Sequence, residues 1–138
     1  KIKSNTICYT AEKDKPISVN IAKHPQFISN EYIDGQGIFT FKNKITSIPE
    51  KAFFDCSKLD SIIIPESVTE IGNSVFTRCH YLKMVYCQST TPPTLGENAF
   101  SNISREAKIC VPKNSVALYK SANGWKDYAS KIVGCDFK

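Results

Sequence analysis

The chain has 138 residues, of which 18 are basic and 13 acidic, so its formal net charge is +5. This length suits a single domain with its own hydrophobic core. Because 16 of the basic residues are lysines scattered along the whole chain, and only Arg78 and Arg105 could supply guanidinium forks, the charge indicates a solvated surface and argues against nucleic-acid binding.

The sequence predicts no transmembrane segment. Its longest aliphatic run, Ile62-Ile63-Ile64, is far shorter than the roughly 20 apolar residues that cross a bilayer. No apolar stretch follows the first residues, as it would in a signal peptide. If the protein is exported, we expect its targeting segment to be absent from this sequence.

Residues 1–37 predict an N-terminal β cap. Strand-like stretches lie at 6–10, 17–21 and 27–32, and the turn Asp34-Gly35-Gln36-Gly37 leads into the next strand.

Residues 38–112 repeat with a period of 23 to 24 residues. The segment Phe53-Phe54-Asp55-Cys56 recurs as Phe76-Thr77-Arg78-Cys79, and a decayed third copy brings Phe100 into register with Phe76. Such a period predicts a mixed α/β leucine-rich repeat solenoid. We expect short parallel strands at 39–41, 62–64, 85–87 and 109–111, stacked about 4.8 Å apart. Beneath them, Phe53, Phe76 and Phe100 should form a ladder of rings.

Residues 113–138 predict a C-terminal helical cap. Asn114 or Ser115 can cap the start of a helix that Gly124 ends. Trp125, Tyr128 and Ile132 follow at spacings of three and four, which predicts a second short helix.

The repeat sequence resembles a known family. The run Val68-Thr69-Glu70-Ile71-Gly72, followed by Val75-Phe76 and Cys79, is similar to the BspA-like leucine-rich repeats of surface proteins from oral and gut anaerobic bacteria. The resemblance implies a secreted or cell-surface location, commonly as a lipoprotein, and no catalytic activity. It also implies adhesion to a protein or glycan on host or neighbouring cells. The ligand, the anchor and the oligomeric state stay open.

Six cysteines give little sign of chemistry. Cys56 and Cys79 share one repeat position and Cys87 stands where Ile64 stands, so we expect these three to be buried thiols. No close cysteine pair indicates a metal site, no cofactor motif is present, and no catalytic residues can be assigned. A disulfide between Cys110 and Cys135 is the better hypothesis, because Cys110 should face outward and Cys135 lies on a tail that could fold back.

The outward side of the strands is the predicted binding surface. Period-2 alternation places an apolar and aromatic cluster there, which favours an interaction site. The predicted residues are Ile38, Thr40, Ser61, Ile63, Met84, Tyr86 and Lys108. Alternatively, residues 1–30 fold across this surface. The leading functional hypothesis is an adhesion or protein-interaction module, and the alternative is a structural spacer or capping domain of an envelope assembly.

Overall fold

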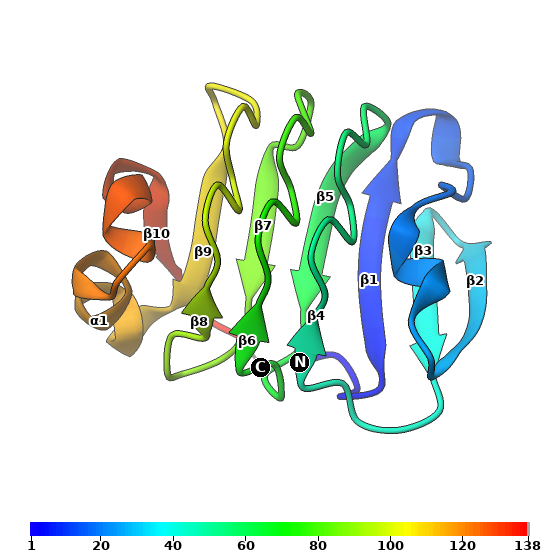
Figure 1. Cartoon of the computed structure of the whole chain (residues 1–138), viewed down its shortest axis with the longest axis horizontal. Helices are drawn as coiled ribbons and strands as arrows, with labels where there is room; N and C mark the ends of the chain where they lie inside the picture. The colour runs from blue at the N-terminus through cyan, green and yellow to red at the C-terminus, as the bar shows by residue number, and fades with distance from the viewer. Residues whose placement is uncertain (138) are drawn as a thin grey trace.

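A seven-stranded mixed sheet forms the main layer of the computed structural model, which describes residues 1–137. The strand order is β10-β9-β7-β5-β1-β3-β2, and a second, parallel sheet of three short strands, β4-β6-β8, lies in front of it (Figure 1). The large sheet contains β1 (Thr6–Ala11), β2 (Phe27–Ile33), β3 (Gln36–Phe41), β5 (Leu59–Ile64), β7 (Met84–Cys87), β9 (Lys108–Pro112) and β10 (Ile132–Cys135). The small sheet contains β4 (Ser47–Ile48), β6 (Glu70–Ile71) and β8 (Thr94–Leu95).

The three repeat strands β5, β7 and β9 pair in parallel, as the sequence predicts. Ile62 lies opposite Val85, and Val85 lies opposite Ile109. All three side chains are fully buried, because alternate residues of a strand point to one face and the repeat keeps the apolar residue in phase. The three predicted strands at 62–64, 85–87 and 109–111 are therefore confirmed.

The fourth predicted strand is present, but its predicted neighbour is wrong. Residues 39–41 belong to β3, which does not pair with β5: β1 lies between them and runs antiparallel to both. β1 can take this place because its residues Ile7 and Tyr9 point into the core at alternate positions, as the core residues of the repeat strands do. The sheet is therefore mixed, whereas a simple solenoid predicts parallel neighbours throughout.

Elsewhere in the N-terminal segment, two of three predicted strands are confirmed as β1 and β2. The third, at 17–21, is wrong, since this stretch is a loop leading into the 3-10 helix η2 (Asn20–Lys23). Its backbone groups find partners outside any ladder: the N–H of Ile17 donates to the Tyr9 hydroxyl and that of Ile21 to the carbonyl of Ala52. A further 3-10 turn, η1 (Glu12–Asp14), follows β1.

The phenylalanine ladder is confirmed. The rings of Phe53 and Phe76 are stacked with centroids 5.4 Å apart, and those of Phe76 and Phe100 are stacked at the same spacing. Phe39 continues the column edge-on at one end, and Trp125 lies against Phe100 at the other. Each ring is held in a tight turn between two residues of left-handed backbone, at positions that recur in every repeat: Lys51 and Asp55, Ser74 and Arg78, Asn98 and Asn102.

The C-terminal segment is less helical than predicted. The first helix is confirmed in shortened form as the 3-10 turn η3 (Lys113–Ser115) and α1 (Val116–Ser121), before Gly124 at a φ of 80°. The second is the 3-10 helix η4 (Trp125–Lys131), and Ile132 lies beyond it, in β10. This last strand, which was not predicted from the sequence, pairs in parallel with β9.

Candidate functional site

The outer face, defined as the side of the large sheet that points away from the phenylalanine ladder, carries the predicted surface residues. Ile63 lies opposite Tyr86, and in the adjacent row Ser61 lies opposite Met84, which in turn lies opposite Lys108. The structure therefore brings five of the seven predicted residues together on β5, β7 and β9. Lys108 is exposed and the other four are half-buried.

The remaining two predicted residues lie farther along the same face. Ile38 and Thr40 are on β3, and β1 separates them from β5. Cys8 lies opposite Ile38 on one side and Ile63 on the other. It is 5% exposed, and this burial raises the pKa of its thiol. The predicted row is thus interrupted by a cysteine that was not among the predicted surface residues, although the alternation around it predicts the strand.

The C-terminal tail lies over one end of the outer face. Cys110 and Cys135 are joined by a disulfide with a Cα separation of 5.6 Å. Just beyond it, the ring of Phe137 meets that of Tyr86 edge-on, with centroids 6.5 Å apart. These two rings and Ile63 line a hollow of about 350 Å³. Phe137 was not predicted from the sequence to be part of this surface. The only indication was the prediction that the tail carrying Cys135 folds back.

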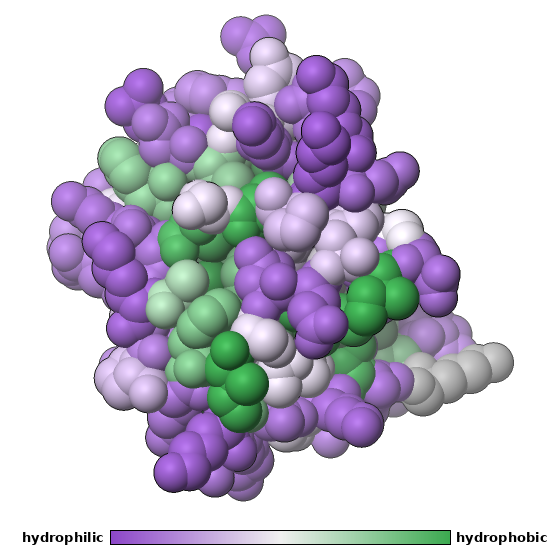
Figure 2. Space-filling view, turned by 90° about the vertical axis from the view of Figure 1, so that its right-hand side faces the viewer, coloured by the Kyte–Doolittle hydropathy of each residue, from purple (hydrophilic) through white to green (hydrophobic). Residues whose placement is uncertain are grey.

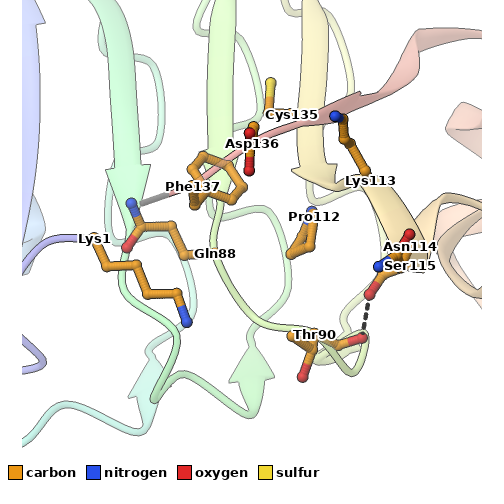
Figure 3. A pocket seen from close by; sticks show the side chains of 10 residues that line it. All are labelled: Lys1, Gln88, Thr90, Pro112, Lys113, Asn114, Ser115, Cys135, Asp136 and Phe137. Atoms are coloured by element: carbon orange, nitrogen blue, oxygen red, sulfur yellow. Dashed lines mark hydrogen bonds between the residues drawn. The ribbon is translucent and has the colours of Figure 1, made fainter.

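The N-terminal residues reach the same corner of the sheet. The N–H of Ile2 donates to the Gln88 side chain at 3.2 Å, and the Lys1 ammonium pairs with Glu66 at 2.7 Å. Figure 3 shows Lys1, Gln88 and Phe137 around one hollow of about 470 Å³. Of residues 1–30, the first few border the outer face and Cys8 is part of it, because β1 and β2 lie within the sheet. The alternative hypothesis, that this segment folds across the face, is therefore wrong for β1 and β2, which form part of the sheet.

A comparison with known protein families identifies the family of this chain. Residues 28–123 match the family model described as BspA type leucine rich repeat region (6 copies). The chain belongs to the BspA-type leucine-rich repeat family. No curated protein matches the sequence. Repeats of this BspA type are generally non-catalytic and typically occur in surface or secreted bacterial proteins.

The four free cysteines of this BspA-type chain are all buried. Cys79 is fully buried and donates to the carbonyl of Phe53 at 3.0 Å. Burial raises the pKa of Cys79 to about 12, which favours the protonated, less nucleophilic thiol at neutral pH. His80, its neighbour in sequence, is exposed.

Two further properties concern the described part of the chain. Within residues 1–137, no group of three or more His, Cys, Asp or Glu side chains is placed to hold a metal ion. Nor does this part contain a helix with the length and apolar character needed to cross a membrane.

Proposed function

We propose that this chain is a protein-recognition module that acts outside the cell or at its surface and binds through the outer face. The observation that carries the proposal is the contiguous cluster of Ile63, Met84 and Tyr86 on two paired strands. All three are half-exposed on the side of the sheet away from the core. Large apolar and aromatic side chains gathered in this way are typical of interaction surfaces.

Family membership supports an extracellular location and an adhesive role toward a protein or glycan on host or neighbouring cells. The disulfide between Cys110 and Cys135 is consistent with this location, because disulfides persist in oxidising compartments. We also infer that residues 38–112 form a short solenoid between an N-terminal cap (1–37) and a C-terminal cap (113–138), which is supported by the parallel strand pairs and the ring ladder.

The test is the binding of wild-type protein and a Tyr86→Ala variant to a panel of purified extracellular matrix proteins and to intact host cells. Loss of a central aromatic side chain should weaken binding by a factor of about 30, which corresponds to about 2 kcal/mol. Leu118→Ala is the matched control, because Leu118 is an exposed apolar residue, 56% accessible, on α1, which lies beyond the β10 end of the sheet (Figure 1). Unchanged binding by a Tyr86→Ala variant with an unaltered melting temperature would refute this surface.

The alternative role as a structural spacer is favoured by the contact between Phe137 and Tyr86. A surface that the chain's own tail occupies has less need of a soluble partner. In that case neither wild type nor a Phe137→Ala variant would show saturable binding to any probe in the panel.

A further inference from the structure

A third hollow, distinct from the two on the outer face, lies where β5 begins and β1 ends. Its volume is about 440 Å³, within the range of about 300–1,000 Å³ that is usual for small-ligand sites. Segments distant in sequence meet here, at the top of Figure 1: the end of β1, the start of β5 and the residues that precede β7. Tyr86 lies toward the other end of β7.

The floor of this hollow is fixed by the backbone. The N–H of Glu12 donates to the carbonyl of Lys58, and the N–H of Lys83 donates to the carbonyl of Asp60, both at 2.9 Å. The Asp60 carboxylate accepts a hydrogen bond from the Thr10 hydroxyl at 3.4 Å. The backbone that carries the lining side chains is therefore fixed before a ligand arrives, which lowers the entropy cost of binding.

An exposed aromatic ring borders the hollow. Tyr81 is 64% exposed, and the residue at its position in the preceding repeat is Lys58. The repeat therefore does not require an aromatic residue here, and the core does not use this one. A tyrosine with both an exposed ring face and a hydroxyl group combines an apolar platform with a hydrogen-bonding end.

The charged side chains that line the hollow have a net charge of zero. Glu12 and Asp60 supply two carboxylates, and Lys58 and Lys83 supply two ammonium groups. Within residues 1–137 none of these four makes an ion pair. Such a lining has no net attraction for an anion or a cation, yet it offers strong hydrogen-bond acceptors and donors.

We propose that this hollow binds a neutral, hydroxyl-rich glycan. The apolar C–H face of one sugar ring lies on the ring of Tyr81, whose π face carries partial negative charge and attracts those hydrogens. Hydroxyl groups of the sugar donate to the carboxylates of Asp60 and Glu12 and accept from the ammonium groups of the two lysines. This glycan site is separate from the protein-binding surface proposed above.

The test is a nuclear magnetic resonance titration of the whole chain with three neutral oligosaccharides, maltohexaose, cellohexaose and chitohexaose, each to about 10 mM, the range of weak binding. At least one should shift the amide resonances of Asp60, Tyr81 and Lys83. Tyr81→Ala should weaken that binding by a factor of about 10 or more, whereas Tyr81→Phe, which keeps the ring, should bind within a factor of about 3 of wild type. Because Tyr81 is largely exposed, the folded spectrum should persist in both variants.

Tyr86→Ala serves as the control for the outer face and should leave the oligosaccharide shifts unchanged. The proposal is overturned if none of the three oligosaccharides shifts these amides, if Tyr81→Ala binds as tightly as wild type, or if the shifts fall on the outer face instead. Loss of protein binding by Tyr86→Ala with oligosaccharide binding intact would support the two surfaces separately.

Discussion

Truncation of Phe76 to alanine should destabilise this chain more than any surface substitution. Phe76 is the central ring of the ladder, fully buried and stacked at 5.4 Å on both Phe53 and Phe100. Replacement of a buried phenylalanine by alanine costs about 3 to 5 kcal/mol. The value should lie in the upper part of this range, because two aromatic contacts, each worth about 0.5 to 1.5 kcal/mol, are lost together.

The expected effect on the melting temperature follows from the chain length. Unfolding entropy of about 2.1 cal/mol/K per residue gives about 0.3 kcal/mol/K for the whole chain, so a loss of about 4 kcal/mol should lower the melting temperature by about 14 °C. The measurement is thermal unfolding followed by circular dichroism, with urea unfolding as an independent measure of the free energy.

Phe54→Ala provides a matched control in the preceding repeat. Phe54 adjoins the ladder residue Phe53 in sequence, but its ring is only half-buried and lies near the ammonium of Lys51, 5.5 Å from the ring centroid. The same truncation there should cost clearly less. If Phe76→Ala and Phe54→Ala lower the melting temperature equally, the stacked column is not what stabilises the repeats.

Two further predictions concern the cysteines. A Cys110→Ser/Cys135→Ser double variant should lose about 3.5 kcal/mol of unfolding free energy, which is the chain-entropy value for cross-linked residues separated by 25 positions. An unchanged urea midpoint would contradict this prediction, as would a mass of the unreduced wild-type protein that corresponds to six free thiols. Stability should also fall at high pH, because burial raises the pKa of Cys79 from an ordinary 9.0 to about 12. The unfolded chain therefore releases this proton first, so the contribution of Cys79 is complete below about pH 9 and is lost as pH rises toward 12. The urea midpoint should be lower at pH 10.5 than at pH 8. This decrease should be smaller in Cys79→Ala, and a decrease of equal size in that variant would rule out Cys79 as its source.

The repeats could be predicted from sequence because each repeat carries the same local information. Ile62, Val85 and Ile109 hold one phase of the alternation, and Phe53, Phe76 and Phe100 hold one position in the turn, so knowledge of one repeat determines the others. The left-handed residues at the ladder turns were not predicted, because Lys51, Ser74 and Asn98 share a backbone conformation but no common side-chain type.

The N-terminal segment could be predicted only as far as its individual strands. The alternation in Thr6–Ala11 predicts a strand, but nothing local identifies β5, some 50 residues later, as its partner. For the same reason the sequence could not place Cys8 between Ile38 and Ile63 on the outer face. The tail posed a similar difficulty: the helical spacing of Trp125, Tyr128 and Ile132 predicted one helix, whereas pairing with β9 draws Ile132 into a strand.

Neither of the two proposed binding surfaces could be predicted completely from the sequence. The proposed glycan site depends on the proximity of Glu12, Asp60 and Tyr81, which the tertiary pairing of β1 with β5 creates. β2, at the other end of the sheet, also carries exposed apolar residues that were not predicted from the sequence to form a surface. Ile28 and Ile33 are more than half exposed there, and apolar and polar side chains alternate over that end of the molecule (Figure 2).

The position of β1 has a consequence for the order of folding. During synthesis this strand precedes residues 59–64, which form one of its two flanking partners, by more than 40 residues. Contacts between segments so far apart form slowly, because a long loop must close first. Until then the buried side chains Ile7 and Tyr9 stay open to other partners. The nascent chain is therefore prone to aggregate in the interval before β5 is complete.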